Sequence, residues 1–230
     1  MSLDLAELLD LGRTPHRTLF DGCRFPWEAL PRIGAFFATL GKPAVLGRVA
    51  SSAVLEGDVW IGEGAVVEPH AFIRGPTWIG RNGVVRQGAY VRGHVLAGDG
   101  CILGHSCEFK NCVLFDEAIV PHFAYVGDSI LGHKVHLASG VTLSNVKVTP
   151  GNIALTLEGA KLDTGLHKFG AILGDGAEVG CHSVLNPGSV IGRGAVLYPG
   201  LVWRGVCPPG VIVKLVQQHG ETVRRPAHEP

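Results

Sequence analysis

The stretch VLEGDVWIGEGAVVEPHAFIRGPTWIGRNGVV, residues 54–85, repeats one pattern every six residues. A large aliphatic residue occupies each sixth position, and a small or β-branched residue follows it four positions later. Helical geometry would scatter residues with this spacing around the helix axis, so the period excludes an amphipathic helix. Hexapeptide periodicity is instead typical of a parallel β-helix, in which each short strand turns one apolar side chain inward.

The same period extends well beyond this stretch in both directions. It begins at Val49, continues to Phe115, and resumes from Leu173 to Leu197. One aliphatic residue per hexapeptide resembles the pattern of the left-handed, three-sided β-helix. We therefore predict an all-β chain whose short parallel strands stack in coils about 4.8 Å apart.

Three segments depart from the period and define the expected organisation. Residues 1–45 contain DLAELLDL and WEALPRIGAFFATL, which predict two short helices, with Pro31 near the first turn of the second. The β-helix domain is expected over 46–210, with a hairpin-like loop excursion at 143–171, where TPGN and LEGAKLDTG supply turn residues. Residues 211–230 are expected to form a C-terminal tail.

Composition excludes several classes of function. Lys plus Arg and Asp plus Glu both number 20, so no strong field attracts nucleic acid or an anionic membrane. No apolar run approaches the roughly 18 residues that a membrane span needs, and the acidic N-terminal stretch is unlike a signal peptide. A cytoplasmic protein is the expectation. The 6 cysteines form no C-x-x-C pair, which favours buried thiols over a metal site.

The period slips around VPHFAYVGDS, residues 120–129. If Phe115 and Val120 are successive inward residues, the step between them is five, and it is five again from Val126 to Leu131. His122 lies between the two slips. An irregularity of this kind can turn a side chain outward, although His122 alone would read as an ordinary exposed corner histidine.

A wider stretch carries a family resemblance. Residues 108–148, EFKNCVLFDEAIVPHFAYVGDSILGHKVHLASGVTLSNVKV, and 167–192, HKFGAILGDGAEVGCHSVLNPGSVIG, resemble the acetyltransferase half of bifunctional sugar-1-phosphate nucleotidylyltransferase/amino-sugar-1-phosphate acetyltransferases. The archaeal-type members are the most similar. The combination of H-x-x-Y-x-G-D with GVTLSN is more specific than the hexapeptide repeat.

The resemblance implies acetyl transfer from acetyl-CoA to the amine of a hexosamine 1-phosphate. His122 matches the family's general base, a role that imidazole can fill near neutral pH. Tyr125 matches a residue that lines the sugar site. Arg92 and Lys110 match positions that hold the sugar phosphate, for which cations are required.

Four further residues acquire roles from the same resemblance. Asn145 and Lys168 match residues of the sugar and acetyl region, and Cys181 matches a small residue beside the acetyl-CoA thioester. His136 falls in the substrate region where related members commonly have asparagine. Val146 replaces a tyrosine there, which leaves the choice between glucosamine 1-phosphate and galactosamine 1-phosphate open.

The family also implies a homotrimer with sites between subunits, because a solenoid has flat faces and no deep pocket of its own. No metal is expected, and no Gly-rich nucleotidyl-transfer loop occurs in the chain, so nucleotidyl transfer is not expected either. Two alternatives stay open. One is a non-catalytic trimeric scaffold, and the other is a zinc enzyme like the γ-carbonic anhydrases, which would use three of the histidines.

Overall fold

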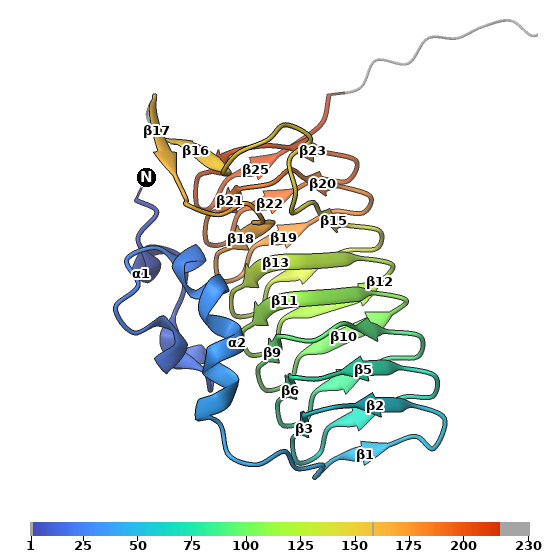
Figure 1. Ribbon diagram of the computed structural model, residues 1–230. Coiled ribbons are helices and arrows are strands. Elements are labelled where there is room, and N and C mark those ends of the chain that lie inside the picture. Colours follow the sequence, from blue (N-terminus) through green and yellow to red (C-terminus); the bar gives the residue numbers. More distant parts are fainter. Residues whose placement is uncertain (1, 158, 217–230) are drawn as a thin grey trace, which may run out of the picture.

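The computed structural model describes residues 2–157 and 159–216, and these form a β-solenoid flanked on one side by helical turns (Figure 1). The expected left-handed parallel β-helix is confirmed. Parallel strands of successive coils stack in register, from β1 at one end to β25 at the other, so the solenoid presents three flat faces.

Face 1 is a sheet of nine short parallel strands. In stacking order they are β1 (Arg48–Val49), β4 (Val66–Val67), β7 (Val84–Val85), β10 (Ile102–His105), β12 (Ile119–His122), β14 (His136–Leu137), β19 (Glu178–Val179), β22 (Val196–Leu197) and β25 (Ile212–Val213).

Face 2 follows face 1 along each coil. It consists of β2 (Val54–Glu56), β5 (Phe72–Arg74), β8 (Tyr90–Val91), the first parts of β11 (Glu108–Leu114) and β13 (Tyr125–Leu131), β15 (Thr142–Leu143), β20 (Val184–Leu185) and β23 (Val202–Trp203).

Face 3 completes each coil. It consists of β3 (Val59–Ile61), β6 (Thr77–Ile79), β9 (Val95–Ala97), the last parts of β11 and β13, β18 (Ala171–Leu173), β21 (Ser189–Ile191) and β24 (Val206–Cys207). Because β11 and β13 run unbroken around a corner, faces 2 and 3 form one 14-stranded sheet.

The interior is a column of the aliphatic residues that the six-residue period singles out. Ile61 pairs with Ile79 and Ile79 with Ala97 in parallel register, so a regular coil takes 18 residues, or three hexapeptides. Ile61, Ile79 and Ala97 are at most 1% exposed and belong to one continuous apolar cluster. Close stacking of coils and burial of this column together hold the solenoid.

Two coils are one residue shorter, and one predicted slip lies elsewhere. Leu114 pairs with Ala97 below and Leu131 above, so these coils take 17 residues. The slip between Val126 and Leu131 is confirmed. The slip predicted between Phe115 and Val120 is wrong, because Leu114 is the inward residue and the short step runs from Phe109 to Leu114.

Phe115 therefore points out of the solenoid instead of into it. Its ring lies 5.6 Å from the ring of Phe20 in the N-terminal segment. A sequence period assigns a phenylalanine to the interior by its apolarity, and here a second apolar cluster outside face 3 competes for it.

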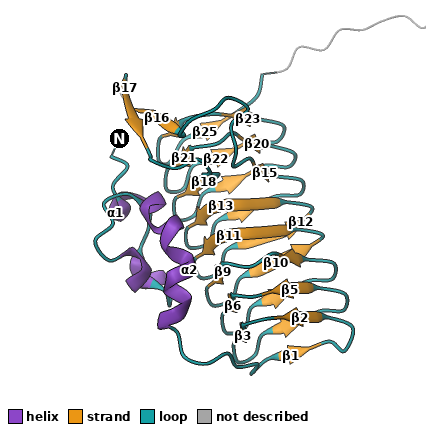
Figure 2. Cartoon of the chain, viewed as in Figure 1, coloured by secondary structure: helices purple, strands orange, loops and turns teal. Residues whose placement is uncertain are grey.

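The N-terminal segment is a chain of short helical turns laid along face 3 (Figure 2). Its α-helices α1 (Leu5–Leu8) and α2 (Ile33–Phe36) are single turns, and 3₁₀ turns cover Leu11–Arg13, Arg17–Phe20, Pro26–Arg32 and Phe37–Thr39. Pro26, not Pro31, starts the second helical stretch, and Pro31 lies inside its 3₁₀ part, contrary to the prediction. Prolines at both positions keep this stretch from being one regular α-helix.

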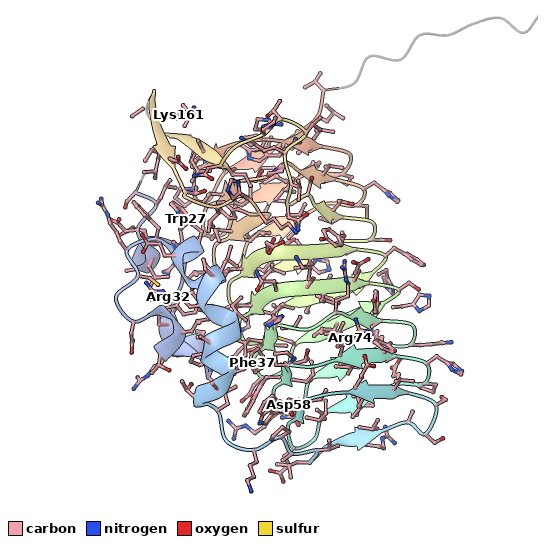
Figure 3. The ribbon with its side chains drawn as sticks, viewed as in Figure 1. Trp27, Arg32, Phe37, Asp58, Arg74 and Lys161 are labelled. Carbon is pink, nitrogen blue, oxygen red and sulfur yellow. The ribbon has the colours of Figure 1, made fainter. Side chains whose placement is uncertain are left out.

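The segment seals face 3 with apolar side chains. Trp27 and Phe37, labelled in Figure 3, are only 2% and 6% exposed. They pack in a cluster with the outward residues of the face 3 strands, which are Trp60, Leu96, Val113, Ile130, Ile172 and Val190. Face 3 is consequently an internal surface of this chain.

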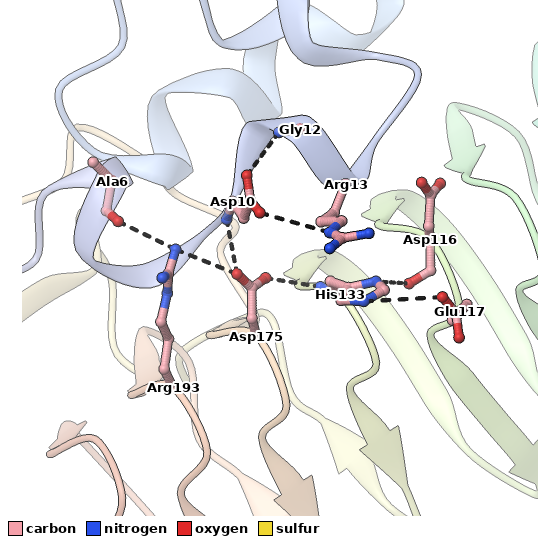
Figure 4. Close-up of polar contacts among 9 residues, drawn as sticks. All are labelled: Ala6, Asp10, Gly12, Arg13, Asp116, Glu117, His133, Asp175 and Arg193. Atoms are coloured by element: carbon pink, nitrogen blue, oxygen red, sulfur yellow. Dashed lines mark hydrogen bonds and ion pairs between the residues drawn. The ribbon is translucent and has the colours of Figure 1, made fainter.

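Polar contacts tie the start of the segment to the corner that leads from face 3 back to face 1 (Figure 4). The Asp175 carboxylate accepts hydrogen bonds from the backbone N–H groups of Asp10 and His133, both at 2.8 Å. Arg193 donates to the Ala6 carbonyl at 3.2 Å and forms an ion pair with Asp175 at 3.3 Å. One carboxylate thus joins three separate parts of the chain.

The predicted excursion is confirmed as a hairpin. Its strands β16 (Ala154–Leu157) and β17 (Ala160–Asp163) are antiparallel, and they interrupt the coil that connects Leu131 to Leu173. Ile153 and Leu155 are buried in the same cluster as Phe169. None of the helices in the described ranges is long and apolar enough to cross a membrane.

Phe115→Ala is expected to lower the free energy of unfolding by about 3–5 kcal/mol, because it opens a cavity between the N-terminal segment and face 3. Urea denaturation measures the change. Val54→Ala, at a residue 48% exposed on face 2, is the control, with an expected change within about 0.5 kcal/mol. A Phe115→Ala protein as stable as the control would show that this contact is unimportant.

His16 predicts an acid-sensitive step in stability. It is 1% exposed between Phe36 and Trp78, and burial lowers its pKa from 6.5 to about 4, against a smaller opposing effect of Asp99. Because the folded-state pKa lies below the unfolded value, His16 favours unfolding as the pH falls from 6.5 towards 4. Relative to His16→Leu, the wild type should lose about 3 kcal/mol over this interval in urea titrations. Parallel pH curves for the two proteins would contradict the prediction.

Candidate active site at the corner between faces 1 and 2

His122 ends strand β12 and stands at the corner where the chain passes from face 1 to face 2. The backbone is bonded to the coils on both sides. Phe123 N–H donates to the His105 carbonyl at 2.9 Å, and Gly140 N–H donates to the His122 carbonyl at 3.1 Å. His105 and His122 are therefore equivalent positions in successive coils. Ser139 and Cys181 continue the same column, because His182 N–H donates to the Ser139 carbonyl at 2.9 Å.

The imidazole of His122 is open to a reactant. It is exposed, and within the part of the chain that the structure describes it forms no side-chain hydrogen bond. Its nearest aromatic neighbour is Phe123, 59% exposed, at a ring distance of 6.3 Å. A ring nitrogen without a partner can accept a proton from an incoming nucleophile.

The two five-residue steps in the period do not lie at His122. Both short steps fall at the corner between faces 2 and 3, at Asn111 and Asp128, whose φ angles are 46° and 47°. The prediction that the slips turn His122 and Tyr125 outward is therefore wrong. An ordinary corner already exposes His122, and the shortened corner positions Asp128 instead.

Tyr125 begins strand β13 and lies half-buried on the outer side of face 2, opposite Glu108 and Thr142 of the adjacent coils. Burial raises the pKa of its phenol above the ordinary value, and the negative charge of Asp128 adds to the rise. Tyr125 thus stays a neutral hydrogen-bond donor over a wider pH range than a free tyrosine.

The predicted phosphate cations occupy successive coils of face 2. Arg92 forms an ion pair with Glu108, with Nη1 2.6 Å from Oε1. Lys110 lies 3.5 Å from Oδ2 of Asp128. Arg74, labelled in Figure 3, is one coil further and pairs with Glu56. Each cation is therefore held by a carboxylate.

Asn145 follows strand β15 and donates from Nδ2 to Oδ2 of Asp128. Its carbonyl accepts from Phe169 N–H at 3.0 Å, so the end of the excursion returns beside it. This places exposed Lys168 next in sequence to a residue bonded to Asn145. Tyr125, Lys110 and Asn145 are thereby brought together around one carboxylate.

His136 and Cys181 lie on the other side of the corner, on face 1. They line a shallow hollow of about 270 Å³ together with Glu178 and Tyr198. The structure thus divides the predicted residues between two faces, with the hollow on face 1 and the cluster around Asp128 on face 2. His122 stands on the edge between them.

Glu108, Asn111 and Asp128 were missed as site residues. Asp128 is part of the quoted H-x-x-Y-x-G-D motif, and the five-residue step marks its position, so the signal was present. A five-residue step also marks Asn111, but the sequence reading placed that step after Phe115 instead of between Phe109 and Leu114. Glu108 carries no comparable signal, because its contact with Arg92 depends on stacking between coils.

Among residues 2–157 and 159–216, no group of three or more His, Cys, Asp or Glu side chains is placed to hold a metal ion. Within one chain, the described residues thus supply no three-histidine site of the γ-carbonic anhydrase kind.

The chain is similar in sequence to one protein family and to several known proteins. The family described as GMPPB C-terminal domain matches residues 73–164. The bifunctional sugar-1-phosphate nucleotidylyltransferase/acetyltransferase of Sulfurisphaera tokodaii is 33% identical over 68% of this chain and 39% of its own length. The bifunctional protein GlmU of Methanococcus maripaludis is 34% identical over 75% of this chain and 41% of its length.

Among solved structures, a mutant of GDP-perosamine N-acetyl transferase from Caulobacter crescentus, in complex with CoA and GDP-perosamine, is 16% identical with a TM-score of 0.20. The match covers 74% of this chain and 52% of that one, and a TM-score this low carries no argument.

The fold defines a hexapeptide-repeat β-helix protein. The chain is a homologue of the archaeal bifunctional sugar-1-phosphate nucleotidylyltransferase/acetyltransferases, which confirms the resemblance seen in the sequence. It spans about two fifths of the length of these relatives.

Proposed function

We propose that the chain transfers the acetyl group of acetyl-CoA to the amine of an amino-sugar 1-phosphate, either glucosamine 1-phosphate or galactosamine 1-phosphate. The observation that carries the proposal is the position of His122, whose imidazole is exposed and forms no hydrogen bond within the described chain. It stands on the edge between the cluster of Tyr125, Lys110 and Asn145 and the hollow that contains Cys181.

The reaction requires one base and one neutral nucleophile. The sugar amine attacks the thioester carbonyl carbon through its nitrogen lone pair, and His122 accepts the proton that the nitrogen loses. The carbon–sulfur bond then breaks, and the CoA sulfur takes the proton from the His122 imidazolium, so CoA leaves as a thiol and His122 is neutral again. In this proposal His122 carries out the proton transfers, while Tyr125 and Asn145 bind the sugar.

Arg92 and Lys110 bind the phosphate in this proposal. Successive coils place them about 4.8 Å apart along face 2, a spacing that one phosphate group can bridge. Their partners Glu108 and Asp128 hold them in position without substrate. A phosphate dianion competes with these carboxylates, and the guanidinium of Arg92 can meet it with two parallel hydrogen bonds.

We further propose that the site is completed by a second copy of the chain in a homotrimer. The N-terminal segment covers face 3, but faces 1 and 2 carry outward apolar residues, among them Tyr90, Val202 and Ile212, which are 40%, 73% and 59% exposed. Packing face 1 or face 2 against a neighbouring chain would bury these residues. The corner that carries His122 would then line a cleft between subunits, with the acetyl-CoA arm beside Cys181.

A non-catalytic scaffold is the second candidate. It is favoured by one observation, the pairing of Arg92 and Lys110 with carboxylates, which already satisfies both charges without a substrate. The kinetic experiment below distinguishes the two candidates, because a scaffold turns over no amino-sugar phosphate.

His122→Ala is expected to lower kcat by about 10²–10⁴-fold, because the amine loses its proton acceptor. Thiol release from acetyl-CoA is followed with glucosamine 1-phosphate and galactosamine 1-phosphate in turn. His105→Ala is the matched control at the equivalent position one coil away, and it should leave kcat within about twofold. Unchanged turnover in His122→Ala would exclude the proposed base, and a wild type without turnover would favour the scaffold.

Acetyl-CoA is expected to protect Cys181 from alkylation, because the proposed thioester position covers the hollow on face 1. Iodoacetamide labelling of the intact protein is read by mass spectrometry of peptides. At a concentration of roughly ten times its Kd, acetyl-CoA should slow labelling of Cys181 about tenfold. Cys23, half-buried in the N-terminal segment, is the internal control. Equal protection of both thiols, or of neither, would speak against this binding position.

A further inference from the structure

Asp128 is a buried carboxylate that the proposed mechanism uses only as the partner of Lys110 in the absence of substrate. It is 4% exposed and sits at the shortened corner between faces 2 and 3, in the left-handed region of φ. An ionised group this deeply buried needs compensating partners, because removing it from water is costly. The groups that contact the Asp128 carboxylate therefore indicate its function.

The carboxylate has three side-chain partners, two from the preceding coil and one from the following coil. Asn111 donates from Nδ2 to Oδ1 at 2.8 Å, and Asn145 donates from Nδ2 to Oδ2. Lys110 Nζ lies 3.5 Å from the same Oδ2. Strand β11, strand β13 and the segment after β15 thus meet at this one group.

The backbone of Asp128 adds a fourth connection. Gly170 N–H donates to the Asp128 carbonyl at 2.8 Å, while Phe169 N–H donates to the carbonyl of Asn145. The excursion that begins after Asn145 therefore returns to the same corner. Asp128 and Asn145 together hold both ends of it.

The shortened coils explain this convergence. In a regular coil the corner contains an extra residue, as at Arg74–Gly75–Pro76–Thr77, whereas β11 and β13 run through the corner without one. Asn111 and Asp128 then stack directly in successive coils, because Lys110 pairs with Gly127 and Cys112 with Ser129. Asparagine and aspartate tolerate the positive φ that this tight corner imposes.

We infer that Asp128 is a positioning residue for the acceptor side of the proposed site, which orients the amide of Asn145 and restrains Lys110. A carboxylate only accepts hydrogen bonds, so it must be met by the Nδ2 of Asn145 and not by its oxygen. The Oδ1 of Asn145 is then left as an acceptor for an N–H or O–H group of the sugar. Lys110 is held more loosely, at 3.5 Å, and remains able to turn to a phosphate.

This inference rests on the proposed function, and a purely structural role is its competitor. A structural carboxylate would affect stability and leave substrate recognition intact. A positioning carboxylate would affect the KM of the amino sugar while leaving the KM of acetyl-CoA unchanged, since acetyl-CoA binds on the other side of the corner. The two roles therefore predict different ratios of the KM for the amino sugar to the KM for acetyl-CoA.

The test compares Asp128→Asn with Asp175→Asn, a matched carboxylate that bonds backbone N–H groups at the corner between faces 3 and 1. Asp128→Asn should raise the KM for the amino-sugar 1-phosphate about tenfold or more, which corresponds to loss of one hydrogen bond to a charged group. The KM for acetyl-CoA should stay within about twofold. Asp175→Asn should alter the melting temperature but neither KM. A normal amino-sugar KM in Asp128→Asn would overturn the inference.

The double variant Asp128→Asn/Asn145→Asp separates a structural role of the carboxylate from a positioning role. It restores one amide–carboxylate pair, so melting temperature should recover, but it presents a carboxylate where the sugar would meet an amide. Activity that recovers together with stability would show that the role is structural only. If Asp128→Asn does not fold, Asn111→Ala loosens the same carboxylate from the far side and should raise the same KM.

Rejection of the proposed acetyl transfer can be distinguished from rejection of the positioning role of Asp128. A wild type without turnover or binding of either amino-sugar phosphate would reject the function itself. A crystal structure of Asp128→Asn then tests the positioning role without substrate. A turned Asn145 side chain and a displaced Lys110 support it, and an unchanged pair of side chains contradicts it.

Discussion

Parallel stacking of the coils is the constraint on which the rest of this structure depends. Each strand bonds to the strand above and below, and each face contributes one aliphatic side chain per coil to the interior, as with Ile61, Ile79 and Ala97. A residue cannot be added or removed within a strand without turning inward side chains outward. Variation is therefore confined to the corners, as the shortened coils and the hairpin excursion both show.

The three faces differ in whether another part of the chain covers them. The outward residues of face 3, from Trp60 to Val190, are apolar and are sealed by the N-terminal segment. Faces 1 and 2 have no such cover within the described chain, and they meet at the corner that carries His122. The segment therefore decides which surfaces are available to a second chain, and it leaves the corner site between the two that are.

Corner geometry also separates the parts of the site. An ordinary corner exposes His122, whereas the shortened corner buries Asp128 beneath Lys110 and Asn145. One side of the edge is thus built from a charged network and the other from a shallow apolar hollow with Cys181. This division suits a reaction with a phosphorylated sugar on one side and a thioester on the other.

The six-residue period by itself determined the fold class and the presence of the excursion, because burial of one aliphatic residue per strand imposes that spacing directly. It did not determine the end of the solenoid, since the last strand, β25 (Ile212–Val213), lies in the predicted tail. The motif around His122 and Tyr125 also indicated the relatives and the candidate base. Only the tertiary structure decided that Leu114 faces inward and Phe115 outward, since two apolar clusters compete for neighbouring residues and a period cannot rank them. It also decided the surroundings of Asp128, whose partners Asn111 and Asn145 are each 17 residues away along the chain and become neighbours only through stacking of the coils.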